Sequence, residues 1–150
     1  MIEIRPLAQD ELEQATAALP LHRLVDHEVT AYLVAWDDGQ PVGHVYVAWS
    51  GTQLGVPELQ DMWVLPDRRG SGIGTVLVRA AERGHRRCSL SVSAANDRAR
   101  RLYERLGYRR ADVPPARVRG VIEVRGGTIE VDDTLLFYVR AVDFPAARTS

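Results

Sequence analysis

Apolar residues alternate with polar ones, or run together over a few positions, in seven short segments of the chain. Both patterns are typical of β-strands, the first with one buried face and the second with two. The segments are residues 2–4, 31–36, 42–49, 58–65, 86–93, 121–124 and 134–142. Residues 37–40, Asp-Asp-Gly-Gln, separate two of them by turn-forming residues and predict a β-hairpin.

Three other segments repeat apolar residues every three or four positions, as amphipathic helices do: residues 10–19, 72–83 and 96–106. The third is the clearest, because Gly107 follows its apolar stripe where a helix usually ends. Residues 50–57 and 111–119 are expected to be loops, and 125–133 a glycine-rich connection. The order of elements predicts an α/β or α+β fold: one domain over residues 1–150, with a mixed sheet, mainly antiparallel N-terminal strands and about three to four flanking helices.

The composition is that of an ordinary globular domain, with 45% hydrophobic and 26% charged residues among 150. No apolar run approaches the roughly 20 residues that span a bilayer, and the first residues lack the pattern of a signal peptide. The single cysteine, Cys88, excludes an internal disulfide and suits a reducing compartment. Too few Cys and His residues stand at ligand spacing for zinc. We therefore expect a cytoplasmic protein without a membrane span or a metal.

Charge is distributed unevenly along the chain. Residues 1–61 contain ten acidic residues and two arginines, whereas residues 62–125 contain fifteen arginines and six acidic residues. One interpretation is coding bias with solvated helix faces. The other is a basic half for a polyanionic ligand and an acidic half for a cationic one. A nucleic-acid partner is disfavoured, because no recognition module is present and the aromatic residues do not interleave with the arginines.

The most informative stretch is PDRRGSGIG, residues 66–74, between a predicted strand and a predicted helix. A helix N-terminus offers unpaired N–H groups, and glycines let a phosphate approach them. Arg68 and Arg69 add cationic donors. A tight turn would normally need only one glycine. A P-loop is excluded because no lysine follows Gly74, and Thr75 in place of a glycine disfavours a dinucleotide site. The stretch therefore predicts a pyrophosphate site of another kind.

These residues resemble the GNAT superfamily of N-acetyltransferases. Its loop, Gln/Arg-x-x-Gly-x-Gly/Ala, is matched by residues 69–74, RGSGIG. The strand end Val-Leu-Pro at 64–66 matches as well, as do Asn96 with Tyr103 seven residues later and the Leu-Gly-Tyr at 106–108. The resemblance extends from the first strand to about Val142. One departure is the short interval of 22 residues from Gly74 to Asn96, which implies a short helix after the loop.

The resemblance implies acetyl-CoA as the donor, with its pyrophosphate on the glycine loop. The backbone of residues 62–64 would pair with the pantetheine arm and polarise the acetyl carbonyl, and Tyr103 would protonate the leaving thiolate. The cofactor-binding residues implied are Met62, Trp63, Val64, Arg68, Arg69, Gly70, Ser71, Gly72, Ile73, Gly74, Thr75, Asn96 and Tyr103.

The residue that deprotonates the amine stays open between Asp61, Glu58 and an ordered water. Either carboxylate could equally be an ordinary exposed strand residue, and a bulge in this strand would hide which one faces the acetyl group. His44, on a central strand, is expected to be packed or hydrogen-bonded. His27 is a weak candidate for the acceptor site.

The function that follows is transfer of an acetyl group to a primary amine of a small molecule or peptide, by direct attack in a ternary complex. The alternative is a non-catalytic CoA-binding sensor or partner subunit, and the resemblance also allows dimerisation through the last strands.

Overall fold

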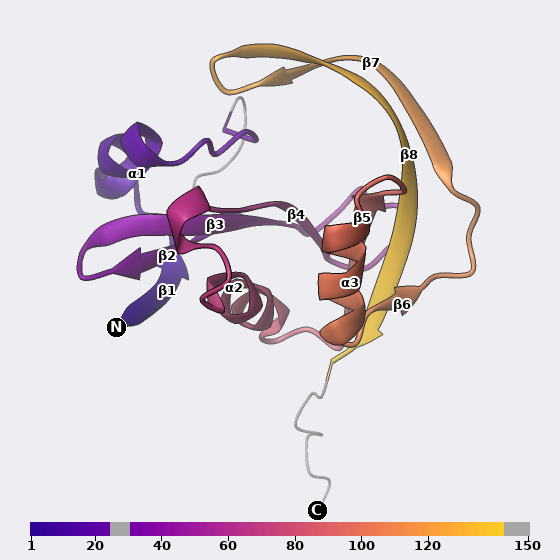
Figure 1. The fold of residues 1–150 in the computed structure, drawn as a ribbon, viewed down its shortest axis with the longest axis horizontal. Helices are drawn as coiled ribbons and strands as arrows, with labels where there is room; N and C mark the ends of the chain where they lie inside the picture. The colour runs from indigo at the N-terminus through magenta and orange to yellow at the C-terminus, as the bar shows by residue number, and fades with distance from the viewer. Residues whose placement is uncertain (25–30, 143–150) are drawn as a thin grey trace, which may run out of the picture.

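The computed structural model describes residues 1–24 and 31–142 of the chain. Eight strands form one curled, mixed sheet in the order β1-β2-β3-β4-β5-β8-β6, and β7 pairs with β8 (Figure 1). The strands are β1 (Ile2–Pro6), β2 (Tyr32–Asp37), β3 (Gln40–Ala48), β4 (Glu58–Val64), β5 (Arg87–Ser93), β6 (Arg109–Arg110), β7 (Ala116–Val124) and β8 (Gly127–Ala141). The helices are α1 (Leu12–Ala18), α2 (Ile73–Glu82) and α3 (Asp97–Arg105), with short 3-10 turns at Gln9–Glu11 and Pro66–Arg68. The predicted mixed α/β architecture is confirmed.

Strands β1 to β4 are antiparallel, as predicted. The hairpin between β2 and β3 turns at Asp38 and Gly39, whose φ angles are 50° and 81°. Positive φ at both central residues is the geometry that matches the twist of the two strands. The turn-forming sequence at 37–40 therefore closes the hairpin where it was expected.

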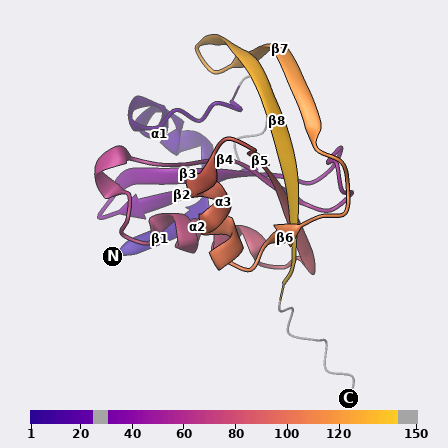
Figure 2. The ribbon, with the colours of Figure 1, turned by 45° about the vertical axis from the view of Figure 1, so that its right-hand side comes forward.

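Helices α1 and α2 cover opposite faces of the first strands (Figures 1 and 2). Each helix closes its own hydrophobic cluster. Leu77 and Val78 of α2 belong to the larger cluster, which continues under α3 to Tyr108 and β8. Ala15 of α1 belongs to the smaller cluster with Tyr32 and Val34 of β2. The central strands are thus buried on both sides, which explains their nearly continuous apolar runs.

The last two strands are much longer than predicted. The segments at 111–119 and 125–133 were expected to be largely loop or connection, but β7 begins at Ala116 and β8 at Gly127, and they pair over their whole common length. Most of these residues are exposed, and cross-strand ion pairs such as Arg117 with Asp132 join them. A ribbon exposed on both faces needs no apolar alternation, so periodicity could not reveal it. The two-residue strand β6 was also missed.

The β7–β8 hairpin arches away from the sheet and bends back toward α1 (Figures 1 and 2). Arg125, in its turn, fixes the tip there. The Arg125 guanidinium donates to the carbonyl oxygens of Pro20 and Leu19 at 2.8 and 2.9 Å. Its backbone N–H donates to the carbonyl of His22 at 3.0 Å. A cation at the end of a helix satisfies carbonyls that lack helical partners, so this contact closes the arch.

Candidate active site

The sheet opens between its two central strands. Strands β4 and β5 run parallel but pair only through Glu58 with Ser89 and Leu59 with Leu90. Beyond Leu59 they diverge, so residues 62–64 of β4 are paired with β3 on one side and, among the described residues, with no strand on the other. Backbone groups at such an edge are available to a ligand that lies along them as a strand would.

A cavity of about 450 Å³ occupies this region, within the usual size range of small-ligand sites. It is bounded by the open part of β4, the glycine loop, the start of α2 and one side of α3. Eleven of the thirteen residues predicted to bind the cofactor line it: Met62, Trp63, Val64, Arg68, Arg69, Gly70, Gly72, Ile73, Gly74, Thr75 and Asn96. Ser71 and Tyr103 do not.

The glycine loop has the backbone that its sequence indicates. Gly70 and Gly72 have φ angles of 84° and 88°, and Gly72 is the N-cap of α2. A Cβ at either position would meet no atom within 4 Å, so conformation rather than space requires glycine there. The ten-residue helix α2 therefore begins against the cavity with its first N–H groups free of helical partners. The start of α2 is therefore suited to binding a phosphate group.

The two loop arginines are engaged with the protein. Arg68 forms an ion pair with Asp37 at 2.6 Å, which raises the pKa of Arg68. Arg69 donates from Nε to the Val64 carbonyl at 2.9 Å, and its guanidinium lies 4.8 Å from the centre of the Trp63 ring. Arg69 thus stiffens the junction between β4 and the loop.

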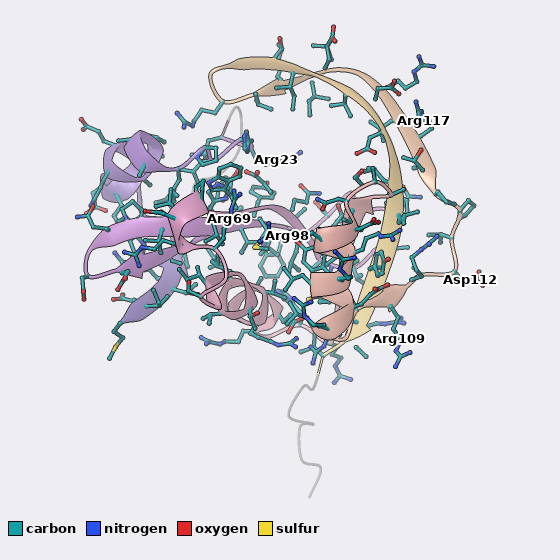
Figure 3. All side chains as sticks on the ribbon, viewed as in Figure 1. Arg23, Arg69, Arg98, Arg109, Asp112 and Arg117 are labelled. Atoms are coloured by element: carbon teal, nitrogen blue, oxygen red, sulfur yellow. The ribbon has the colours of Figure 1, made fainter. Side chains whose placement is uncertain are left out.

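Helix α3 contributes cavity residues that the sequence did not single out: Arg98, Ala99, Leu102 and Arg105. Ala99 and Leu102 belong to the apolar stripe seen in the sequence, which could have indicated them. Within residues 1–24 and 31–142, neither Arg98 nor Arg105 has an ion-pair partner. Figure 3 shows Arg98 near the middle of the molecule and Arg109 and Arg117 on its outside. Arg98 and Arg105 are therefore the cations most accessible to a ligand's phosphates.

Asn96 is the N-cap of α3, and its Oδ1 accepts a hydrogen bond from the Ala99 N–H at 3.1 Å. Tyr103, on the same helix, is half-buried and packs edge-to-face against Tyr108. Burial raises the pKa of the Tyr103 hydroxyl to about 12, so it keeps its proton at neutral pH. In the described part of the chain this hydroxyl has no hydrogen-bond partner.

Asp61 lies in a β-bulge, as the sequence allowed. Between two regular pairs of β3 and β4, Asp61 and Met62 together face Val45, and Asp61 has a φ of 49°. Its carboxylate accepts three hydrogen bonds: the His22 N–H at 2.9 Å, the His22 Nδ1 at 2.7 Å and the Tyr32 hydroxyl at 2.5 Å. Burial and the bond to Asp61 raise the pKa of Tyr32. Asp61 therefore connects β4 to the loop after α1.

Three consecutive backbone N–H groups of that loop point into this polar cluster. They belong to Leu21, His22 and Arg23, and they donate to His44 Nε2, Asp61 Oδ2 and the Tyr32 hydroxyl at 3.1, 2.9 and 2.8 Å. The turn is set by Leu21, which has a φ of 44°, rare for a non-glycine residue. The loop is thus held by the strands beneath it.

His44 is fully buried beneath the bulge, and the expected hydrogen-bonded role is confirmed. Its Nε2 accepts from Leu21, so its Nδ1 must carry the proton and donate to the Asp61 carbonyl, 2.8 Å away. Burial lowers the pKa of His44 to about 4. His27, the acceptor-site candidate, lies outside the described residues.

Glu58, the other candidate base, stands where β4 and β5 are still paired. It is 7% exposed, and Gln60 donates to its Oε1 at 3.0 Å. The two carboxylates therefore occupy different places, Glu58 at the closed end of the strand gap and Asp61 at its opening. Cys88 is buried, and burial raises the pKa of its thiol to about 11, so it is a poor nucleophile at neutral pH.

None of the described helices is long and apolar enough to cross a membrane. Within residues 1–24 and 31–142, no three His, Cys, Asp or Glu side chains are grouped so that they could hold a metal ion.

Comparison with known proteins identifies the fold and the family. The model of the acetyltransferase (GNAT) family matches residues 2–108. The Escherichia coli K12 protein YjgM, an uncharacterized N-acetyltransferase, is 34% identical over 98 residues, which are 61% of this chain and 59% of that protein. The matched segment thus spans less than two thirds of that relative.

Two solved structures illustrate the similarity of fold. The ribosomal-protein-S18-alanine N-acetyltransferase of Escherichia coli superposes with a TM-score of 0.67 at 18% identity, covering 100% of this chain and 99% of that one. Naa50 of Arabidopsis thaliana, in complex with the bisubstrate analogue CoA-Ac-MVNAL, gives 0.65 at 15% identity, over 94% and 99% of the two chains. With the glycine loop and the opened sheet, the family match leads to one conclusion: the chain belongs to the GNAT family of acetyltransferases.

Proposed function

We propose that this domain, residues 1–150, transfers the acetyl group of acetyl-CoA to a primary amine of a small molecule or peptide. The observation that carries the proposal is the cavity that joins the glycine loop to the unpaired edge of β4. A phosphate site and a free strand edge, joined end to end, suit a ligand with a pyrophosphate and an amide-containing arm. Naa50, which binds a conjugate of CoA and a peptide, supports both CoA as the carrier of the acetyl group and a peptide as a possible acceptor.

In the proposed complex the pyrophosphate lies on the N–H groups at the start of α2, between Gly72 and Thr75. Arg98 and Arg105 of α3 supply positive charge to the phosphates. The pantetheine arm continues along residues 62–64, so that the acetyl group ends near the bulge at Asp61. The site then holds the thioester at a fixed place, which is a large part of what catalysis of acyl transfer requires.

Catalysis of the transfer needs three further interactions. The carbonyl oxygen needs an N–H donor as negative charge develops, and the free edge of β4 supplies backbone N–H groups. The leaving thiolate needs a proton, and the Tyr103 hydroxyl has one to give because it stays protonated at neutral pH. The amine must lose a proton before it can attack.

A thiol-release assay over a panel of amines, amino acids and peptides tests the proposal. We expect release of CoA that depends on one class of amine. The matched control is Gly72→Glu, which places a side chain at a φ of 88° and a negative charge at the helix N-terminus. It should lose acetyl-CoA binding in calorimetry while retaining its fold. Binding of acetyl-CoA without turnover of any amine would favour the alternative, a CoA-binding module.

A further inference from the structure

The His22 imidazole lies beside the bulge of β4, in contact with Asp61 and near Trp63. Its Nδ1 is 2.7 Å from Asp61 Oδ1, and its ring centre is 6.2 Å from that of Trp63, a cavity residue. The side chain is 39% exposed, whereas that of Asp61 is 14% exposed. This pair of residues, 39 positions apart in sequence, is not accounted for by the binding of CoA.

The hydrogen bond fixes which imidazole nitrogen holds the proton. A carboxylate can only accept, so His22 Nδ1 must be the donor, and the lone pair of the neutral ring is then on Nε2. In the part of the chain that the structure describes, Nε2 has no partner. An oriented imidazole with a free Nε2 is the arrangement by which histidine serves as a general base.

We propose that His22 accepts the proton of the attacking amine and that Asp61 positions it, an inference that rests on the proposed acetyl transfer. Asp61 is a poor base itself, because both its oxygens already accept hydrogen bonds from His22 and Tyr32. His44 is excluded because it is buried with both ring nitrogens bonded. Glu58 is nearly buried at the closed end of the gap.

The backbone of His22 is held from two sides, which makes the imidazole a preorganised group. Its N–H donates to Asp61 Oδ2, and its carbonyl accepts from the Arg125 N–H at the tip of the β7–β8 hairpin. The backbone of His22 is therefore bonded both to β4 and to the β7–β8 hairpin. Positioning of this kind lowers the cost of bringing a base to its substrate.

The proton balance of the step is simple. An ammonium group gives one proton to His22 Nε2, and the freed lone pair forms the C–N bond at the acetyl carbonyl. When the tetrahedral species collapses, the C–S bond breaks with its electron pair on sulfur. The nitrogen loses its second proton to solvent water, and the sulfur gains one from Tyr103, which is reprotonated from solvent. The exposed His22 imidazolium releases its proton to water, so one amide, one thiol and one proton leave.

The kinetic test compares wild type with His22→Gln and with His85→Gln, the same substitution at a histidine that packs edge-to-face against Trp49. We expect His22→Gln to lower kcat by roughly 100-fold to 10,000-fold, the usual contribution of a general base. The KM for acetyl-CoA should stay within about twofold of the wild-type value, because the substitution leaves the binding of acetyl-CoA unchanged. The His85→Gln protein should behave as wild type.

Two further readouts separate a base from a merely structural residue. Wild-type turnover should decrease at acidic pH, and that decrease should be absent from His22→Gln. The charged and titratable groups that face His22 are Asp61 of β4, Tyr32 of β2, His44 of β3, Arg125 of the hairpin turn and its neighbour Arg23. Because His22→Gln leaves all of these groups in place, a loss of the pH dependence would be caused by the removal of the imidazole. Added imidazole should also restore part of the activity of His22→Ala.

A His22→Gln protein with the kcat and pH profile of wild type would overturn the inference and leave the proposed acetyl transfer intact. So would a loss of kcat in folded His22→Ala that imidazole does not relieve, together with an unchanged pH profile in His22→Gln. If wild-type protein binds acetyl-CoA but acetylates no amine, the proposed function fails, and the role of His22 fails with it.

Discussion

Acidification should destabilise this protein through His44. The imidazole is fully buried, its Nε2 accepts from the Leu21 N–H, and burial lowers its pKa from 6.5 to about 4. The unfolded chain therefore binds a proton more readily than the folded protein does between these two values. The stability that His44 contributes is complete above pH 6.5 and is lost progressively as the pH falls toward 4.

The magnitude follows from the two pKa values. The difference between the pKa of 6.5 in the unfolded chain and that of about 4 in the folded protein corresponds to about 3 kcal/mol in total. Between pH 7 and pH 5, linkage gives a loss of about 2 kcal/mol in the free energy of unfolding. For a domain of 150 residues, that loss lowers Tm by about 4 to 8 °C.

Thermal unfolding at pH 7 and pH 5 measures this effect in wild type and in His44→Gln, and the slope with pH is the readout. We expect the drop in Tm to shrink in the variant, because glutamine does not titrate, even if its Tm at pH 7 is lower. Equal drops in the two proteins would refute the reasoning. An NMR titration in which the His44 ring protonates near pH 6.5 in the folded protein would refute it as well.

Four substitutions, one of them a control, test other parts of the structure. Tyr103→Phe should lower kcat at neutral pH and leave the Kd for CoA nearly unchanged, and equal activity would remove this hydroxyl from the mechanism. Arg125→Ala should destabilise the fold by about 2 kcal/mol in chemical denaturation, because charged hydrogen bonds to helix-end carbonyls are lost. The exposed Arg117→Ala should cost less than about 1 kcal/mol, and similar losses for both would contradict the role of the hairpin tip. Gly43→Ala places a Cβ 2.9 Å from a carbonyl oxygen of β4 and should lower the free energy of unfolding by about 1 to 3 kcal/mol in denaturation. At Gly74, by contrast, the atom nearest to an added Cβ is 3.4 Å away and is the terminal methyl of a flexible methionine side chain.

The sequence predicted the parts of the fold whose residues have one consistent environment. The apolar runs of β2 to β5 and the stripe of α3 are set by burial, so periodicity located them. The glycine loop was located because Gly70 and Gly72 need positive φ angles that other residues rarely adopt. Most of the predicted cofactor residues accordingly line the cavity.

The missed features depend on partners far away in sequence. Arg119 and Asp132 face each other in a ribbon exposed on both faces, so no alternation marked it. His22 gave no sign of its bond to Asp61, because the contact requires the bulge of β4 and the positive φ of Leu21 together. Local patterns show where a chain is buried, but they do not show which polar groups meet.

The arch held by Arg125 has a consequence for the order in which the protein folds. The Arg125 side chain bonds to carbonyls 105 to 109 residues earlier in the chain, so the contact closes a loop that contains most of the sheet. Closing a long loop costs entropy that only a formed sheet can offset, so this contact should form late. The same contact should be among the first to open, so amide exchange at residues 124–127 should be faster than in β3. Among the described elements, the tip of the β7–β8 hairpin would then detach from the rest of the native structure before the central strands open.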